Sequence, residues 1–149
     1  MNRDFVEMLS ALRDAGAEYL VVGAHALAAH GRPRATGDLD LWVRPTPQNA
    51  RRVWTALQTF GALLTDIKLD DLTSPDLVFQ IGVVPNRIDI MTGVSGLDFA
   101  DAWNSRITVR LTGLDVSVIG REALIRNKRA AGRPRDLADI ADLEAGDPR

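Results

Sequence analysis

The chain has 149 residues, of which 46% are hydrophobic, and this length favours one domain spanning residues 1–149 over two. The 18 basic and 20 acidic residues leave a net charge of −2, which argues against a general polyanion binder. Without cysteine there is no disulfide, thiolate nucleophile or zinc–thiolate site, and no apolar run suggests a signal peptide or membrane span, so we expect a cytoplasmic protein with no membrane partner.

The N-terminal third predicts a helix, a strand and a short second helix. Apolar residues at helical spacing predict an amphipathic helix over about residues 3–15, ended by Gly16. The apolar run 19–22 lacks alternation and predicts a strand covered on both faces. It ends at Gly23, where the chain turns into a helix over 24–29 whose free N–H groups could bind an anion. An ordinary strand-to-helix turn explains Gly23 equally well.

Two aspartates lie on one face of the next predicted strand. A period of two places Asp38, Asp40 and Trp42 together, opposite the apolar residues between them. Paired carboxylates on a strand suit a divalent cation, which prefers hard oxygen ligands. The alternative is that these aspartates face solvent and pair with an arginine. The candidates for that arginine are Arg34, Arg44 and Arg87.

The middle of the chain predicts a capped helix and two strands. Thr46 can cap a helix over 47–60 that Gly61 ends. Residues 62–75 have a weak pattern, for which we expect an irregular connection containing at most a short strand. Strands are then predicted over 77–81 and 87–91, and the second of these carries a third aspartate, Asp89, on one face.

The C-terminal third predicts a short helix over 98–105, a β-hairpin over 107–118 and a helical segment over 121–144 that breaks at residues 132–134. In the last helical piece, an apolar stripe is expected to comprise Leu137, Ile140 and Leu143. These elements together predict an α/β (α+β) protein.

These segments resemble the nucleotidyltransferase superfamily with the polymerase-β-type fold. Its signature is a Gly-Gly or Gly-Ser turn, D-x-D on the next strand and a third carboxylate on a later strand, which Gly23, Asp38, Asp40 and Asp89 match. HGRPRATGDLDLWV, RIDIMTG and NKRAAGRPRDLADIADL further resemble small bacterial proteins related to AbiEii-type toxins of abortive-infection and toxin–antitoxin systems. The resemblance covers about residues 19–143. It implies a single nucleotidyltransferase domain with a mixed, twisted β-sheet flanked by helices and a helical C-terminal tail.

The resemblance implies transfer of a nucleoside monophosphate from a nucleoside triphosphate, such as ATP, to a hydroxyl acceptor. Its catalytic residues and metal ligands would be Asp38, Asp40 and Asp89, which would hold two Mg²⁺ ions or, as a substitute, Mn²⁺. The nucleotide would contact Gly23, Ala24, Arg34, Thr36 and Lys128. Ala24 stands where Gly-Ser members have a hydroxyl for the terminal phosphate, so phosphate binding would depend on backbone N–H groups and nearby basic side chains.

Several acceptors are compatible with this sequence. Basic residues Arg32, Arg34 and those within 121–135 could guide the end of a tRNA, or they could be scattered solvated charge. The other two possible acceptors are a protein within a toxin–antitoxin pair and an antibiotic. A cationic drug would need acidic contacts, for which Asp98 and Asp101 are candidates. A different class of protein is a nucleotide-binding or partner-binding module without catalysis, although three retained carboxylates argue against it.

The remaining polar candidates are Lys128, two late aspartates and two histidines. Lys128 lies in a basic run and could face the nucleotide or be solvated. Asp136 and Asp139, three apart on the last predicted helix, could orient Lys128 or a neighbouring arginine, but we expect them at the surface or behind the metal ligands. His25 and His30 are five apart, which does not indicate a zinc site, and His30 is expected to pack or form a hydrogen bond in the loop.

Overall fold

The computed structural model describes residues 2–32, 37–83 and 86–145. Within these residues six strands form one sheet with the order β3-β4-β2-β1-β6-β5. The strands are β1 (Tyr19–Val22), β2 (Leu39–Val43), β3 (Val78–Ile81), β4 (Ile88–Met91), β5 (Ile107–Leu111) and β6 (Leu114–Val118). The pairs β2–β4 and β1–β6 are parallel and the other three pairs are antiparallel, so the predicted mixed sheet is confirmed.

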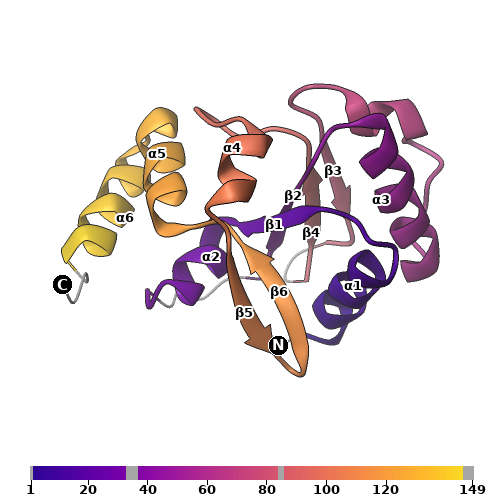
Figure 1. Ribbon diagram of the computed structural model, residues 1–149, viewed down its shortest axis with the longest axis horizontal. Coiled ribbons are helices and arrows are strands. Elements are labelled where there is room, and N and C mark those ends of the chain that lie inside the picture. The colour runs from indigo at the N-terminus through magenta and orange to yellow at the C-terminus, as the bar shows by residue number, and fades with distance from the viewer. Residues whose placement is uncertain (1, 33–36, 84–85, 146–149) are drawn as a thin grey trace.

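Helices flank this sheet at both ends of the molecule (Figure 1). They are α1 (Arg3–Asp14), α2 (Gly23–Ala29), α3 (Pro47–Phe60), α4 (Phe99–Asn104), α5 (Arg121–Ala131) and α6 (Pro134–Ala145), with a 3₁₀ helix, η1 (Leu69–Thr73). The helices α1 and α3 pack on each other at one end, and α5 and α6 form a pair at the other. None of the helices among the described residues combines the length and apolar character needed to span a bilayer.

Local sequence signals account for the ends of the predicted helices. The Thr46 hydroxyl accepts a hydrogen bond from the Asn49 N–H at 3.3 Å, Pro47 occupies the first turn, and Gly61 ends α3 with a φ of +91°. At the end of α1, Gly16 likewise has a φ of +71°. These caps fix the residues at which the helices begin and end.

The core lies between the sheet and the helices. All four residues of β1 are buried, as the uninterrupted apolar run predicts, and so are Leu39, Leu41 and Val43 of β2. The Trp42 side chain, on the opposite face of β2, is also buried and packs edge-to-face on Phe99 of α4. Both faces of the central strands are therefore covered, which holds their side chains in fixed positions.

Several details differ from the sequence-based expectations, among them element ends that shift by one residue, such as the start of β4 at residue 88 in place of 87. Residues 62–75 contain η1 in place of a short strand, and the Lys68 N–H donates to the Asp71 carboxylate at 2.8 Å to start it. The strand β3 begins at residue 78, not 77. Leu137 is 54% exposed and does not belong to the stripe with Ile140 and Leu143, because the buried positions of α6 are 136, 139, 140 and 143, a regular i, i+3, i+4, i+7 pattern.

Candidate active site

Neighbouring strands bring the three predicted aspartates to one face of the sheet. In the parallel pair β2–β4, Asp40 lies directly opposite Asp89, and Leu39 lies opposite Ile88. Asp38, immediately before β2, is therefore level with the residue that precedes β4. Because alternate residues of a strand share a face, the three carboxylates emerge on the same side. They line one pocket with a volume of about 390 Å³.

Arg87, which directly precedes β4, forms ion pairs with two of these carboxylates. Its Nη2 lies 2.9 Å from Asp38 Oδ2, and its Nε lies 2.9 Å from Asp89 Oδ1. A second hydrogen bond, from Nη2 to Asp89 Oδ2 at 3.2 Å, makes the contact with Asp89 bidentate. Of the three arginines considered as partners, Arg44 instead pairs with Glu18, and Arg34 lies outside the described residues.

The glycine turn after β1 lies against the second aspartate. Gly23 has a φ of +68°, a left-handed conformation, and a Cβ atom added to it would overlap with the Asp40 carboxylate. Val22, the residue before it, lies opposite Asp40 in the antiparallel β1–β2 pair. Gly23 thus does more than reverse the chain direction, because its missing side chain leaves the space that the carboxylate occupies.

Burial and mutual repulsion make Asp40 difficult to ionise. Desolvation is the main cause that raises the pKa of Asp40 to about 6, and the charges of Asp89 and Asp38 raise it further, while Arg87 lowers it. A cation bound nearby would stabilise the ionised form of such an acid. The donor set, three carboxylates with hard oxygen atoms, therefore fits divalent ions such as Mg²⁺.

The carboxylates are not yet arranged as a set of metal ligands. Across the described ranges, no three His, Cys, Asp or Glu side chains converge on a single ion position. Arg87 explains this arrangement, because its guanidinium group lies between Asp38 and Asp89. Ion binding would require the guanidinium group to give up these contacts.

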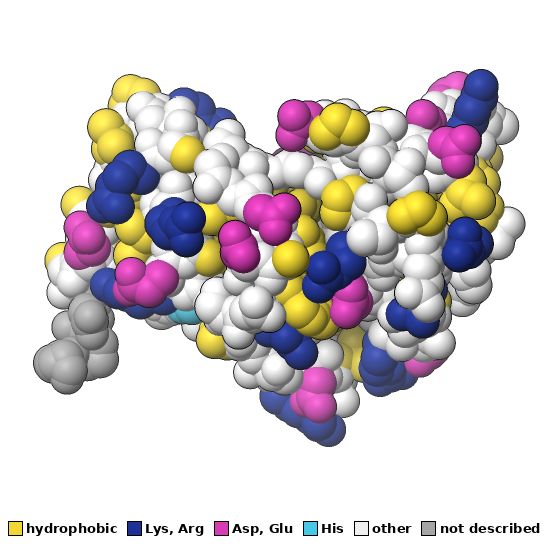
Figure 2. All heavy atoms as spheres, turned by 45° about the horizontal axis from the view of Figure 1, so that its top comes forward, with side chains coloured by type: hydrophobic (Ala, Val, Ile, Leu, Met, Phe, Trp, Pro, Cys, Tyr) yellow, Lys and Arg dark blue, Asp and Glu magenta, His cyan; other side chains and the backbone are white. Residues whose placement is uncertain are grey.

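The part of the pocket lining that comes from α5, α6 and the turn between them is mainly basic. It includes Lys128, Arg133 and Arg135, with Asn127 and Asp136 among them. Figure 2 shows that the surface is hollowed between the part that carries α5 and α6 and the part that carries α1 and α3. A polyphosphate could therefore contact carboxylate-bound cations on one side and basic side chains on the other.

Lys128 is held by two buried aspartates. Its Nζ lies 2.9 Å from Asp139 Oδ2 and 3.5 Å from Asp136 Oδ1, and all three residues are at most 7% exposed. Arg133 Nε also donates to Asp136 at 2.6 Å, which is the main cause that lowers the Asp136 pKa. Of the two positions expected for Asp136 and Asp139, burial excludes the surface, and it also excludes the alternative of a solvated Lys128. The orienting contacts predicted with Lys128 and Arg133 are present.

The other predicted residues are distributed as follows. Gly23 and Lys128 line the pocket; Ala24, the second residue of α2, does not line it, and Arg34 and Thr36 lie outside the described residues. Of the candidates for cation recognition, Asp98 lines a second pocket and Asp101 does not. Sequence reasoning did not identify Asn127 or Asp76 as pocket residues, and neither has a motif that marks it.

The two histidines have separate environments. His30 Nε2 is 2.8 Å from the Ile119 carbonyl oxygen, so the expected hydrogen bond is present. His25 packs edge-to-face on Phe5, with ring centroids 5.5 Å apart, and desolvation lowers its pKa. Neither contact indicates a metal site.

Comparison with known proteins finds relatives by structure only. No protein-family model matches the chain, and no curated protein matches it. A provisionally assigned nucleotidyltransferase from Thermotoga maritima has a TM-score of 0.67 and 14% identity over 96% of this chain and 91% of that one. The lincosamide antibiotic adenylyltransferase LnuA, in its lincomycin-bound structure, has a TM-score of 0.59 and 12% identity over 97% of both chains. The antibiotic-resistance factor ANT(2″)-Ia has a TM-score of 0.57 and 14% identity over 95% of this chain and 88% of that one. At these identities the likeness establishes the fold, and the chain has the mixed α/β fold of the nucleotidyltransferases.

Proposed function

We propose that this protein is a metal-dependent nucleotidyltransferase that transfers a nucleoside monophosphate from a nucleoside triphosphate, such as ATP, to a hydroxyl group in the cytoplasm. One observation carries the proposal: the Asp38, Asp40 and Asp89 carboxylates gather beside the Gly23 turn in a pocket that basic side chains also line. A structural role alone would not require three carboxylates whose charges oppose the ionisation of Asp40. The shared fold is consistent with this chemistry, although fold alone does not establish it.

The same three carboxylates would hold two Mg²⁺ ions, or Mn²⁺ in their place. When bound, such ions supply positive charge to the reacting phosphate and lower the pKa of the acceptor hydroxyl. Arg87 would then be available for phosphate oxygens, to which its planar guanidinium group is well matched. Lys128 of α5 and Arg133, in the turn before α6, would add positive charge.

The proposed transfer forms one phosphorus–oxygen bond and breaks another. The acceptor oxygen bonds to the α-phosphorus, and the bond from this phosphorus to the oxygen that bridges to the β-phosphate breaks. Pyrophosphate leaves with the electron pair, and we assign acceptance of the acceptor proton to the Asp89 carboxylate. Asp89 is 7% exposed, so bulk water has little access to this proton.

Two observations bear on the cellular role and the acceptor, and they favour different acceptors. Resemblance to AbiEii-type proteins supports an RNA end or a protein as acceptor, within a toxin–antitoxin pair. The likeness to LnuA and ANT(2″)-Ia supports a small molecule. The ion pairs that Arg87 forms with Asp38 and Asp89 support the other class of function, a nucleotide-binding or partner-binding module without catalysis.

Transfer of a radioactive label tests the proposal directly. The purified protein is incubated with Mg²⁺ and each α-³²P-labelled nucleoside triphosphate, with total RNA, cell lysate or small molecules as acceptors. The Asp38→Ala, Asp40→Ala double variant should transfer no label. The surface variant Asp115→Ala, whose ion pair with Arg110 is exposed, should transfer as much as the wild type. Metal-dependent nucleotide binding without transfer to any acceptor would favour the binding module.

A further inference from the structure

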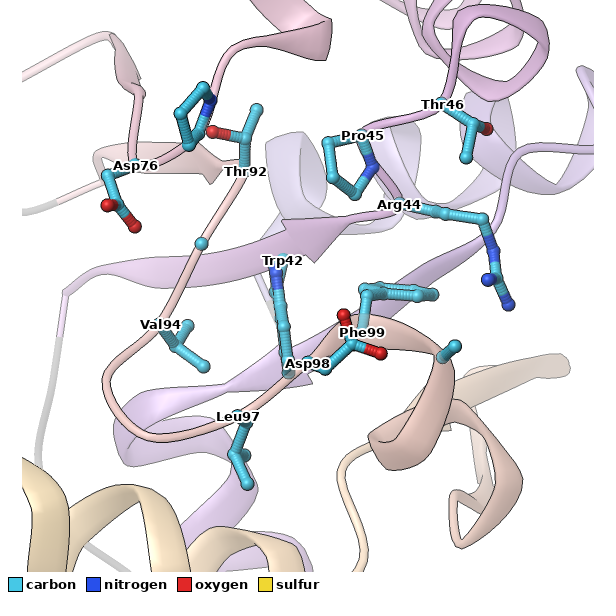
Figure 3. Close-up of a pocket in the computed structure, with 13 residues that line it drawn as sticks. Trp42, Arg44, Pro45, Thr46, Asp76, Thr92, Val94, Leu97, Asp98 and Phe99 are labelled. Carbon is cyan, nitrogen blue, oxygen red and sulfur yellow. The ribbon is translucent and has the colours of Figure 1, made fainter.

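Figure 3 shows a second cavity, also of about 390 Å³. Its lining comes from the end of β2, the loop after β4 and the start of α4, and Val94 lines both cavities. Asp40 and Trp42 lie on the same face of β2, two residues apart, which places them about 7 Å apart along the strand at roughly 3.3 Å per residue. A molecule in this cavity could thus present a hydroxyl group to a phosphate held at the carboxylates.

The charged groups of this cavity leave it with a negative balance. Asp76 and Asp98 reach it from different segments of the chain, and neither forms an ion pair within the described ranges. The cation in the lining is Arg44, which is already balanced by Glu18 at 2.5 Å. Its guanidinium group also lies 4.8 Å from the centroid of the Phe99 ring. The cavity therefore favours a ligand with positive charge.

The backbone around Asp76 and Asp98 bears on how each carboxylate is placed. Asp76 has a φ of +58°, which is uncommon for a residue other than glycine, and a Cβ atom on Gly93 would overlap with the Asp76 carboxylate. Asp98 is the N-cap residue of α4, yet its side chain makes no capping hydrogen bond. An aspartate at this position ordinarily caps the helix, so the carboxylate of Asp98 is available to a ligand instead.

The indole of Trp42 supplies an unused donor in the same wall. Trp42 is 1% exposed, and its Nε1 has no hydrogen-bond partner among the described residues. Buried indole N–H groups ordinarily find a partner, and a hydroxyl oxygen of a ligand could accept this bond. The ring edge of Trp42 lies on Phe99 at a centroid distance of 5.1 Å, so the cavity also has an aromatic wall.

We infer, on the basis of the proposed nucleotidyl transfer, that the acceptor is a small polyhydroxylated amine bound in this cavity by Asp76, Asp98 and Trp42. The two carboxylates attract the ammonium group, one hydroxyl oxygen accepts from the indole, and another hydroxyl is the nucleophile. The acceptor hydroxyl loses its proton, its oxygen bonds to the α-phosphorus of the nucleoside triphosphate, and pyrophosphate leaves. An RNA end is disfavoured because its phosphates would lie near two carboxylates that no cation of the described residues neutralises.

Binding experiments on full-length protein separate this cavity from the nucleotide pocket. Calorimetry uses lincomycin and kanamycin as polyhydroxylated amines, methyl α-glucoside as the neutral control, and ATP with Mg²⁺ for the other pocket. At least one amine should bind, and the glucoside should not. Each of Asp76→Asn and Asp98→Asn should weaken amine binding roughly fivefold while leaving ATP affinity within about twofold.

Two variants control for indirect effects. Asp101→Asn, also on α4 but outside the cavity, should leave amine binding unchanged. Trp42→Phe keeps the aromatic wall and removes the donor, so it should weaken amine binding by a similar factor. Circular dichroism and unchanged ATP binding establish that each variant is folded.

The outcomes distinguish the inference from the proposed function. Label transfer to an amine that declines in the Asp76 and Asp98 variants supports both. If the label enters RNA or protein alone, the inferred amine acceptor is overturned and the proposed nucleotidyl transfer stands. Amine binding that is equal in wild type and both variants has the same meaning. Failure of both amines to bind while ATP and Mg²⁺ bind likewise overturns the acceptor alone. Failure of ATP and Mg²⁺ to bind overturns both.

Discussion

Replacing Asp40 with asparagine tests whether the carboxylate cluster carries unfavourable charge in the absence of metal. Asparagine has nearly the same shape and cannot ionise. Burial, with help from Asp89 and Asp38, raises the pKa of Asp40 from 3.8 to about 6 in the folded protein. The folded state therefore binds this proton more tightly than the unfolded state, and ionisation of Asp40 destabilises the fold.

The size of the effect follows from the shift. A difference of about 2 pKa units corresponds to about 3 kcal/mol, which solvent around the half-buried carboxylate reduces to about 2 kcal/mol. The stabilising contribution of the Asp40 proton is fully present below pH 4 and is lost as the pH rises through 6. Relative to wild type, Asp40→Asn should thus be equally stable near pH 4 and more stable by about 2 kcal/mol at pH 7.5.

Urea unfolding in EDTA between pH 4 and pH 8 measures this difference. Titration of other groups cancels, because both proteins contain them. In excess Mg²⁺ this advantage of the variant should shrink, since metal binding stabilises the wild type by about 2.7 kcal/mol at 100 times the dissociation constant and the variant, which lacks one ligand, by less. A stability difference that does not change with pH, or a wild type that is the more stable protein at pH 7.5 in EDTA, would refute the reasoning.

Three further substitutions test neighbouring contacts. Gly23→Ala should cost at least 2 kcal/mol in urea unfolding, because Cβ would overlap with a carboxylate, whereas Gly16→Ala, at a similar φ in open space, should cost about 1 kcal/mol; equal costs would exclude the overlap. Lys128→Met should lower the free energy of unfolding by about 3 kcal/mol, because it removes the buried cation that pairs with Asp139 and Asp136; an effect below 1 kcal/mol would contradict the pairing. Arg87→Met should lower the melting temperature in EDTA and strengthen Mg²⁺ binding several-fold by calorimetry; weaker binding would show that Arg87 assists the ion rather than competing with it.

Elements with local end signals were predictable from the sequence. The helix α3 begins and ends where Thr46, Pro47 and Gly61 predict, because capping uses only residues next to the helix end. The strand β1 matches its apolar run residue for residue. Residues 62–75 gave no such signal, and the 3₁₀ turn found there depends on a short-range bond from Lys68 to Asp71 that no periodicity reveals.

The site was predictable only in part, because its contacts join distant segments. A period of two places Asp38 and Asp40 on one face of a strand, but only the parallel register of β2 and β4 brings Asp89 beside them. That register also selects Arg87 as the partner of Asp38, a choice that sequence left open among three arginines. Burial of charged residues on α6 was missed for the same reason, since it depends on Lys128 of α5.

The position of Arg87 bears on how such a cluster can exist in a folded protein without metal. Three neighbouring carboxylates would repel one another strongly, and the raised pKa of Asp40 shows that repulsion persists even with Arg87 present. Arg87 donates hydrogen bonds to Asp38 and Asp89 but not to Asp40, so its single positive charge is shared between the two outer carboxylates. The remaining unfavourable charge lies on the carboxylate next to the Gly23 turn, where a phosphate and its cation would arrive. Under the proposed function, metal affinity would then depend on the competition between the ion and this guanidinium group, and it would fall as the pH drops below about 6 because Asp40 takes up a proton.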